Sequence, residues 1–471
     1  MRSFWLEQAL AGDESHAPAL EGEIKADVVI VGGGYAGMWS ALRLKEADPN
    51  LDVVLLEADI CGAGASGRNG GLVVDLWPKF PTIEALCGTD EALRLCRASA
   101  AAIDEIGAFT KSHGFDADFR KTGWLWGTTC RAQAGSWEPY IESLQNHQVR
   151  PVETMGGPEM TARWGLQGHL TAVFDPSQAS IQPAKLARGL RGVVLEKGIR
   201  IFERSAMTKL HRARPPRVET ARGTVTAGKV VLAVNAWSLS VPELAPAIVV
   251  VGAEMAVTDP VPDQLTRMGW RDGPMVSDSR AFVGFYGPTA EGRVAYGRAG
   301  VGLAFGSHIG SQYEGPSPRL PMLRRIMAEV SPEIAALPVA TSWRGPVDRT
   351  KDGLPYFGAL PNCPDVVYVY GFSGNGIVPC FLGGHIVTSL VLGRDDAWAR
   401  SGLVRPVRRN WPPEPIRYIG GNLVLAALDR MDRLQHQGRA VDPLTRALVR
   451  FVPEGFKAKN TSQNSAKGEN R

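Results

Sequence analysis

The sequence has little that would mark a metalloprotein or a disulfide-bonded secreted protein. Its six cysteines are scattered, and no two of them have a Cys-x-x-Cys spacing. Neither a zinc site nor a disulfide framework is therefore indicated. The eight histidines form no spaced pair suited to a metal ion, so we expect no metal. Free thiols are typical of a reducing compartment. The N-terminus has no long apolar run before a small-residue cleavage site, so we expect a cytoplasmic protein.

Long apolar runs and a strong charge of one sign are lacking too. The most apolar stretch, Ala247–Val257, is broken by Glu254 and is too short to span a bilayer, so it predicts a buried strand and no transmembrane segment. The formal net charge is only +4, and no basic run is interleaved with aromatic residues. Both observations argue against nucleic acid as a partner. The length of 471 residues predicts two or three domains.

The most informative segment is a strand–turn–helix–strand pattern that begins at Ala26. Asp27–Val31 is a short run rich in valine, and a glycine turn follows it. Gly37–Ala47 then has a helical pattern, and Asp52–Leu56 is a second apolar run. Strand, glycine turn, helix and strand in this order form a βαβ unit, which predicts a parallel sheet.

The glycine turn has the spacing of a dinucleotide-binding site. Gly32 allows the tight turn, Gly34 lets the backbone approach a pyrophosphate, and Gly37 lets the helix pack close to the strand. The phosphates would lie at the helix N-terminus, where free N–H groups and the helix dipole favour anions. Glu57 ends the second strand about 20 residues later, where an acid binds ribose hydroxyls. A purely structural glycine turn is the alternative interpretation.

A run of small residues, Cys61–Gly71, follows Glu57. Such a run cannot pack a core, but its backbone N–H groups can wrap a ligand closely. A flexible surface loop is the alternative. No second βαβ nucleotide unit is evident in the chain, which disfavours reductases that bind a nicotinamide cofactor in addition.

Four motifs give the chain a resemblance to a known family. They are Gly64–Gly71, Val231–Trp237, Trp343–Pro346 followed by Asp352–Pro355, and Gly371–Gly376. With these motifs in this order, the chain from about Val28 to Leu392 resembles the D-amino-acid oxidase-like (glycine/sarcosine oxidase) flavoprotein family. The first motif looks most like the gamma-glutamylputrescine oxidoreductase branch of that family.

The resemblance implies an α/β fold, α+β overall, in which a Rossmann-like FAD-binding domain is interleaved with a mixed, mostly antiparallel substrate domain. The expected boundaries are 25–85, 180–240 and 340–405 for the FAD-binding domain, 86–179 and 241–339 for the substrate domain, 406–456 for a C-terminal helical extension, and 457–471 for a disordered tail. We expect the flavin ring at the interface of the two domains, where pockets commonly form.

Local patterns add further expectations. Met1–Lys25 looks like an irregular arm whose residues Phe4, Trp5 and Leu6 dock on the body. Glu84–His113 has the spacing of one long helix. Val249–Ala304 contains several strand-like runs with turns between them, as in an antiparallel sheet. Asn422–Gln437 reads as a late amphipathic helix.

The cofactor implied by the resemblance is FAD. Its expected binding residues are Gly32, Gly34, Tyr35, Ala36, Gly37, Glu57, Ala58, Gly64, Ala65, Ser66, Arg68, Asn69, Gly70, Gly71, Met207, Ala233, Asn235, Trp237, Gly345, Asp352, Gly374, Asn375, Gly376 and Ile377. Some family members hold FAD through a cysteine in the stretch that matches Trp343–Pro355. No cysteine occurs there, so we expect non-covalent FAD. The helix start at Asn375–Ile377 would stabilise negative charge on reduced flavin, although a plain turn is the alternative.

The activity implied by the resemblance is oxidation of an amine or amino acid. Hydride passes from the carbon next to the nitrogen to flavin N5, and the imine hydrolyses to an aldehyde or keto acid plus an amine or ammonia. The expected partners are a small-molecule amine and oxygen or another electron acceptor; the oligomeric state stays open. Some family oxidases activate oxygen with a lysine on a strand that matches Arg293–Arg298, where no lysine occurs. A dehydrogenase with a non-oxygen acceptor, or an FAD-binding subunit of a larger complex, is therefore the alternative.

The candidate catalytic residues are Arg68, Tyr286, Arg298 and Arg344. We expect Arg68 near the isoalloxazine, with a phosphate-binding or structural role as the alternative. The other three could hold a polar or anionic group of the substrate, or be structural. If Arg298 and Arg344 converge, an amine with a carboxylate or phosphonate would suit them, while an uncharged or cationic polyamine derivative stays equally open.

Overall fold

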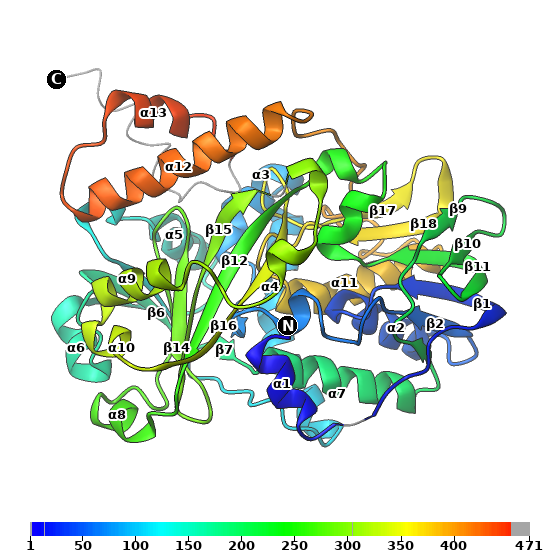
Figure 1. The fold of residues 1–471 in the computed structure, drawn as a ribbon, viewed down its shortest axis with the longest axis horizontal. Coiled ribbons are helices and arrows are strands. Elements are labelled where there is room, and N and C mark those ends of the chain that lie inside the picture. The colour runs from blue at the N-terminus through cyan, green and yellow to red at the C-terminus, as the bar shows by residue number, and fades with distance from the viewer. Residues whose placement is uncertain (1, 14, 304, 454–471) are drawn as a thin grey trace.

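The computed structural model describes residues 2–13, 15–303 and 305–453. Two eight-stranded sheets organise these residues. Figure 1 shows the two sheets side by side, with most helices packed around them. The expected mixed α/β fold, with one largely parallel and one mostly antiparallel sheet, is confirmed.

The first sheet has the strand order β17-β18-β11-β1-β2-β8, with β10 and β9 added beside β11. Its strands are β1 (Gly22–Val31), β2 (Val53–Leu56), β8 (Arg200–Phe202), β9 (Lys209–His211), β10 (Arg217–Glu219), β11 (Gly223–Leu232), β17 (Tyr356–Leu360) and β18 (Cys363–Tyr370). The five strands from β18 to β8 are parallel. Their carboxyl ends therefore lie along one edge, the edge at which ligands bind in parallel sheets.

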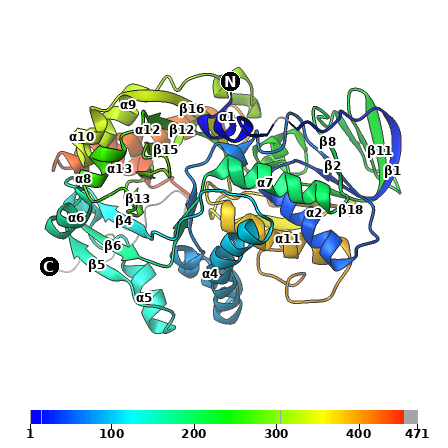
Figure 2. The same ribbon diagram turned by 90° about the horizontal axis from the view of Figure 1, so that it is seen from below.

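The residues of β1 alternate between two cores. Val28 and Ile30 face helices α2 (Tyr35–Ala47), α4 (Thr89–Ser112), α7 (Pro183–Glu196) and α11 (Ile377–Val391). Val29 and Val31 face the other side of the sheet, towards β10 and the segment that follows β11. Figure 2 shows α2, α7 and α11 along one side of the strands. Burial on both faces explains why these strands are continuous apolar runs.

The second sheet has the order β16-β12-β15-β14-β13-β4-β6-β5. Its strands are β4 (Trp124–Thr128), β5 (Glu153–Gly156), β6 (Thr171–Asp175), β12 (Val249–Thr258), β13 (Met275–Asp278), β14 (Gly284–Pro288), β15 (Val294–Leu303) and β16 (Val339–Arg349). All neighbours are antiparallel except β4 and β13. A separate short pair joins β3 (Leu72–Val73) to β7 (Ala179–Ser180).

The remaining helices cover the second sheet and the junction between the sheets. They are α1 (Phe4–Leu10), α3 (Phe80–Cys87), α5 (Glu138–Asn146), α6 (Gly157–Trp164), α8 (Pro262–Arg267), α9 (Leu320–Val330), α10 (Pro332–Ala335), α12 (Ile416–His436) and α13 (Pro443–Val449). No helix among the described residues is long and apolar enough to cross a membrane.

Two local expectations are wrong. The single helix expected over Glu84–His113 is two helices, α3 and α4, because Gly88 interrupts it with a φ of 83° that a helix cannot accommodate. The arm expected to be irregular contains α1 and the first residues of β1. Its expected docking is confirmed, since Trp5 and Leu6 are buried. The tail expected at 457–471 lies outside the described residues.

Candidate functional site

The glycine turn after β1 lies at the carboxyl edge of the first sheet, next to the end of β11. Gly32 has a φ of 116°, and a Cβ there would collide with the carbonyl of Ala233. A Cβ on Gly37 would collide with the carbonyl of Gly32. The turn therefore tolerates only glycine at both positions, because backbone approaches backbone directly. This is the packing that the glycine spacing predicted.

Two helices begin at this edge without side-chain caps. The N-cap residues are Gly34 for α2 and Gly376 for α11, and neither helix has an acidic residue in its first turn. In the first turn of α2, the N–H of Tyr35 already has a partner, because it donates to Ser66 Oγ at 2.9 Å. Uncapped helix starts present N–H groups and positive dipole ends to an anion. The edge is thus suited to a phosphate-containing, negatively charged ligand.

Glu57 follows β2 at the same edge. Its carboxylate accepts hydrogen bonds from Gly33 N at 2.7 Å and from Asp59 N at 2.9 Å. Burial raises the pKa of this carboxyl above its usual value. The acid therefore lies beside the glycine turn, where the hydroxyls of a ribose could replace these backbone donors.

Four of the predicted cofactor glycines could carry a Cβ without a clash. A Cβ on Gly64 would meet its nearest atom, on Trp237, at 3.9 Å, and one on Gly345 would meet Arg68 at 3.6 Å. The corresponding distances for Gly374 and Gly376 are both 3.8 Å. These values are ordinary van der Waals contacts, whereas a Cβ on Gly67 would collide with the carbonyl of Gly62. The loop therefore closes on itself while leaving a cradle, which fits a bound dinucleotide.

Arg68 joins the small-residue loop to the second sheet. Its Nε donates to Ala63 O at 2.8 Å, and its Nη1 donates to Arg344 O at 3.0 Å. Trp343 Nε1 donates in return to Arg68 O at 2.9 Å. Burial lowers the pKa of the Arg68 guanidinium. The structure thus places Arg68 at the junction of the two sheets, and its role beside the isoalloxazine stays a prediction.

Helix α1 holds the same loop from outside, a role that sequence reasoning missed. Ser3 Oγ donates to Gly67 O, and Trp5 Nε1 donates to Asn69 O at 3.0 Å. The ring of Trp5 meets that of Trp343 edge-on, with centroids 5.8 Å apart. The aromatic side chains near the N-terminus were the available signal, because exposed aromatic clusters are unusual.

The other predicted cofactor residues are distributed around the same edge. Asn235 has a φ of 48°, and its side chain accepts a hydrogen bond from Ala236 N at 2.6 Å. Asp352 accepts from Leu354 N at 3.0 Å and pairs with Arg405, so its carboxylate is already engaged. Met207 packs on the core on the far side of the first sheet from α2. Their contacts with FAD stay predictions.

The second sheet has two faces with different chemistry. We call near face the side of Met255, Phe285, Gly297, Trp343 and Gly345, because it meets α1 and the small-residue loop. A Cβ on Gly70 would lie 2.5 Å from the Phe285 ring, and one on Gly297 would lie 2.8 Å from it. We call far face the opposite side, which faces α9 and α12.

Strand register places Tyr286 and Arg298 on the far face. Phe285 pairs with Gly297, Tyr286 pairs with Tyr296, and successive residues of a strand point to opposite sides. Tyr286 is buried and is hydrogen-bonded to His169. Arg298 forms ion pairs with Asp429 at 3.0 Å and with Asp432 at 3.3 Å. Their contacts favour the structural alternative over a role in substrate binding.

Arg344 also points away from the near face. Its Nε lies 3.2 Å from Glu254 Oε1, and its guanidinium lies over the ring of Tyr313 at 5.9 Å. Glu254 is fully buried and accepts a hydrogen bond from Ser317 Oγ at 2.6 Å. Arg298 and Arg344 are both register partners of Glu254, yet each is paired with carboxylates. They do not converge on a site for an anionic substrate group.

The near face itself is aromatic. Trp124 and Trp126 stack with their ring centroids 5.6 Å apart, and Trp124 Nε1 donates to Ser277 Oγ at 3.0 Å. Phe285, Trp343 and Met255 were missed as site residues, although each is the sequence neighbour of a residue that was considered. The period-2 pattern was the signal that could have found them.

A cavity opens where the near face meets the small-residue loop. Its volume is about 420 Å³, including space open to solvent. The lining includes Trp5 from α1, Gly70 from the loop, and Met275 and Gly287 from the second sheet. Arg120 also lines it and donates to Pro288 O. The cavity is therefore lined by the small-residue loop and by the elements that contact it, α1 and the second sheet.

A pair of half-buried cations was missed as well. Desolvation and the neighbouring Arg349 lower the pKa of Lys79 to about 8. Desolvation also lowers the pKa of Arg349 to about 10. Asp348 precedes Arg349 on β16, accepts a hydrogen bond from Gly371 N, and has its pKa raised to about 6 by burial. No motif surrounds Lys79, so only the fold could reveal it.

Among the residues that the structure describes, no group of three or more histidine, cysteine, aspartate and glutamate side chains could hold a metal ion.

Comparisons with known proteins agree with this geometry. A family model described as "FAD dependent oxidoreductase" matches residues 27–390. Gamma-glutamylputrescine oxidoreductase of Escherichia coli is 30% identical over 397 residues, which cover 83% of this chain and 90% of that protein. Glycine oxidase of Pseudomonas aeruginosa is 26% identical over 383 residues, 78% of this chain and 95% of that protein.

Among solved structures, the glycine oxidase from Geobacillus kaustophilus has the same fold. Its TM-score is 0.67 at 22% sequence identity, and the match covers 82% of this chain and all of that chain. The match to the family model stops at residue 390, so it does not include the C-terminal extension. Helices α12 and α13 therefore lie outside the part that the family model describes.

Proposed function

The chain belongs to the family of FAD-dependent oxidoreductases, and on that premise we propose that it oxidises the carbon–nitrogen bond of an aliphatic amine. The observation that carries this proposal is the cradle at the carboxyl edge of the first sheet, facing the aromatic near face of the second. FAD, when bound, accepts the two electrons that leave the substrate. Loss of two electrons converts the amine to an imine. The imine then hydrolyses to a carbonyl compound plus an amine or ammonia.

The residues that would hold FAD are those of the cradle. Gly32, Gly34 and the start of α2 suit the pyrophosphate, because backbone N–H groups there have no acidic side chain in front of them. Glu57 suits the ribose hydroxyls. The start of α11 at Gly376 offers a second positive dipole end, which would stabilise negative charge on the reduced ring system. Non-covalent attachment stays part of the proposal.

The near face would bind the reacting amine. An amine must be neutral to give up hydride readily, and an apolar surrounding lowers its pKa by desolvation. Trp124, Trp126 and Phe285 provide such a surrounding, and tryptophan faces also attract an ammonium ion as it enters. No dedicated base on this chain is needed for the step.

The paired arginines argue against a substrate held through a carboxylate. Arg298 and Arg344 are each neutralised by buried or half-buried acids on the far face. An amine without an obligatory carboxylate next to the reacting carbon is therefore the better fit. This agrees with the relative named gamma-glutamylputrescine oxidoreductase, at 30% identity, more than with the glycine oxidases at lower identity.

The acceptor of the electrons and the compartment belong to the same proposal. All six cysteines are free thiols, which supports a reducing cytoplasm. No lysine lies on the β15 stretch from Arg293 to Arg298; Arg293 there donates to Thr258 O at 2.9 Å and covers the Phe4 ring. The electron acceptor is oxygen or another carrier. The ratio of the turnover rate with oxygen to the turnover rate with an artificial acceptor distinguishes an oxidase from a dehydrogenase.

The test is anaerobic reduction of the purified, FAD-loaded protein. Each member of a panel is mixed with it: gamma-glutamylputrescine, putrescine and a simple alkylamine on one side, and glycine, sarcosine, alanine and proline on the other. Loss of the oxidised flavin absorbance reports transfer of electrons. We expect the amines without a neighbouring carboxylate to bleach the flavin faster, at equal concentration, than every amino acid.

Faster bleaching by glycine, sarcosine or another amino acid would overturn the substrate class but keep the oxidation. A yellow protein that nothing in the panel reduces would overturn the amine activity and favour an FAD-binding subunit of a larger complex. Reoxidation by air compared with reoxidation by an artificial acceptor then assigns the acceptor.

A further inference from the structure

The C-terminal extension carries exposed apolar side chains out of proportion to its length. Among the described residues, eleven large hydrophobic side chains are exposed, and five of them lie between residues 416 and 451. They are Ile416 (63%), Ile419 (57%), Leu423 (53%), Leu444 (70%) and Phe451 (76%). Exposed apolar groups that gather in one region mark an interaction surface.

Helix α12 presents a regular stripe of these residues. Ile416, Ile419, Leu423 and Ala426 are all exposed and follow one another at intervals of three and four residues, so they share one side of the helix. The other side, with Leu425, Leu428 and Met431, is buried against the end of the second sheet. The helix therefore has a second apolar face that the rest of the described chain leaves uncovered.

Neighbouring elements extend this face. Phe305 is 60% exposed, and its ring meets that of Tyr418 edge-on with centroids 5.0 Å apart. Helix α13 packs against α12 and contributes Leu444 and the following Phe451. Figure 1 shows α12 and α13 together along one side of the molecule, away from α1 and α8. We call this set of residues the outer face of the extension.

The charge of the outer face has one sign. Residues 405–453 contain nine arginines, no lysine and four acids. Seven of the arginines are exposed: Arg408, Arg409, Arg430, Arg433, Arg439, Arg446 and Arg450. None of the four acids is exposed, and each is paired: Glu414 with Arg417, Asp429 with Arg298 and Arg433, Asp432 with Arg298, and Asp442 with Arg430. Ion pairs among the described residues thus engage Arg430 and Arg433 but not the other five exposed arginines, so an excess of positive charge lies in the segment that carries the apolar stripe.

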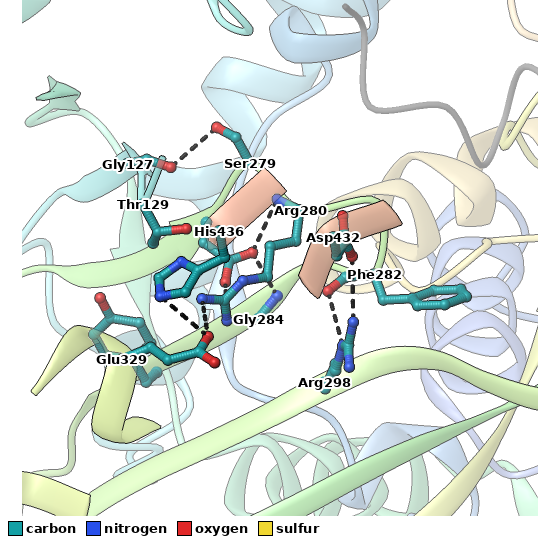
Figure 3. A network of polar contacts seen from close by, with 12 residues as sticks. Gly127, Thr129, Ser279, Arg280, Phe282, Gly284, Arg298, Glu329, Asp432 and His436 are labelled. Carbon is teal, nitrogen blue, oxygen red and sulfur yellow. Dashed lines mark hydrogen bonds and ion pairs between the residues drawn. The ribbon is translucent and has the colours of Figure 1, made fainter. Parts of the chain in front are cut away.

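One buried ion pair and further polar contacts hold α12 in this orientation. Asp432 is paired with Arg298 of β15, and His436 lies 3.8 Å from Glu329 of α9. Arg280 reaches the same Glu329 at 2.8 Å. Figure 3 shows the two groups of side chains, Arg298 beside Asp432, and Arg280 and His436 beside Glu329. The polar anchors use the inner side of α12, so the apolar stripe is held outward and is not a fraying end.

We propose that the outer face of the extension docks on a membrane surface that contains anionic lipid. Apolar side chains flanked by arginines match the acyl boundary and the negative headgroups of such a surface. A second copy of this chain fits less well, because a two-fold contact would bring like charges together. The extension lies outside the family match at residues 27–390, so this surface is separate from the oxidase core.

The experiment is flotation of the FAD-loaded full chain with lipid vesicles. One set is phosphatidylcholine alone, and the other contains 7 parts of phosphatidylcholine to 3 parts of phosphatidylglycerol, roughly the anionic content of a charged leaflet. We expect binding to the anionic vesicles only, weakened by added salt because the attraction is screened. The double variant Arg446→Gln/Arg450→Gln should weaken partitioning by about fivefold per charge removed.

The variant Ile419→Ser/Leu423→Ser tests the apolar part and should also reduce binding, without changing salt dependence. Matched controls alter exposed residues of the same kinds elsewhere: Arg97→Gln/Arg267→Gln for charge and Leu170→Ser/Leu195→Ser for apolar area. The controls should bind as the unmodified chain does, and all variants should retain FAD and amine oxidation.

Absence of binding to anionic vesicles at low salt would overturn the proposal. Equal loss in the variants and in the matched controls would overturn it as well. A dimer in light scattering that Leu423→Ser converts to a monomer would instead assign the face to a second copy. Binding to a polyanionic protein but not to vesicles would assign it to an acidic protein partner.

Discussion

The near and far faces of the second sheet come from the same strands but carry opposite kinds of side chain. Met255, Phe285 and Trp343 on the near face are uncharged. Glu254, Arg298 and Arg344 are each the sequence neighbour of a near-face residue, and they lie on the far face in ion pairs. The near face borders the small-residue loop, and the far face borders α9 and α12.

The difference indicates a division of labour within one sheet. An apolar near face lowers the polarity around a bound amine, whereas buried ion pairs on the far face attach the C-terminal helix in one orientation. Arg298, whose charge looks catalytic in the sequence, is paired with two acids of this helix. Substitutions on the two faces should separate activity from stability, and three of them test this in order of expected effect.

The largest effect is expected on the far face. Arg298→Met leaves Asp432 buried without its cation, with only a hydrogen bond from Ala281 N. Breaking one side of a buried ion pair costs about 3–5 kcal/mol of unfolding free energy. Denaturant unfolding of the FAD-loaded protein measures the loss. Turnover per folded molecule should stay as it is, because Arg298 does not reach the near face.

The double variant Arg298→Met/Asp432→Leu is the matched control and should recover most of the stability, since no charge is left buried at this pair. If Arg298→Met lowered turnover while leaving the unfolding free energy unchanged, the structural assignment of the far face would be wrong.

An intermediate effect is expected at Gly345 on the near face. A Cβ there already meets Arg68 at 3.6 Å, so the longer side chain of a leucine crowds the space beside Arg68. Displacing substrate or cofactor by about 1 Å can reduce kcat/KM by about 100-fold, which corresponds to about 2.7 kcal/mol. Steady-state kinetics with the best amine, corrected for flavin content, measure it.

The neighbour Arg344 provides the comparison for Gly345→Leu. Arg344→Met removes the partner of the buried Glu254 and should reduce stability more than activity. Adjacent residues should thus give opposite profiles. Equal activity losses at both positions would show that the two faces are not separated as the register indicates.

The smallest effect concerns pH and the far-face residue His169. Burial, followed by the nearby Arg280, lowers the pKa of its imidazole from 6.5 to about 4. The unfolded chain therefore binds more protons between these values, and stability falls as pH decreases from about 6.5 towards 4. His169→Gln should remove this part of the pH dependence, which is read from the difference in unfolding free energy between variant and unmodified chain across that range.

The same variant should leave the pH profile of kcat/KM unchanged between pH 5 and 7, a range chosen around the ordinary pKa of histidine, about 6.5. A shift of the kinetic profile would place His169 in contact with the reaction and join the two faces functionally.

The βαβ unit could be predicted because its signals are local. Gly32, Gly37 and Glu57 lie within a unit of strand, turn, helix and strand, and the short apolar runs Asp27–Val31 and Asp52–Leu56 on either side of the helix predict buried strands. The same reasoning missed α1, because a seven-residue helix has little intrinsic stability and forms here through packing of Trp5 and Leu6. It also missed the interruption of α3 and α4, where one glycine outweighs a helical spacing.

The candidate substrate residues were harder, because alternation gives the period of a strand but not which face meets the site. Tyr286 and Phe285 are equally consistent with a half-buried strand. Only the pairing of β14 with β15 and the closeness of Gly70 to Phe285 show that the ring of Phe285 is on the near side. Polar residue type then favoured Tyr286 and Arg298, although α12, far away in the sequence, supplies the ion-pair partners of Arg298, and His169 contacts Tyr286.

The strand order of the first sheet also bears on how the protein is made. The central strand β1 lies between β2 and β11, and β11 in turn lies between β1 and β18. The ribosome completes β2 at Leu56 but β18 only at Tyr370. At about 5–20 residues per second, that interval lasts roughly 15 to 60 s. Throughout it, the growing sheet has at least one strand edge whose partner is not yet synthesised: first the edge of β1, which awaits β11, and then the edge of β11, which awaits β18, so an apolar edge stays unpaired during most of translation.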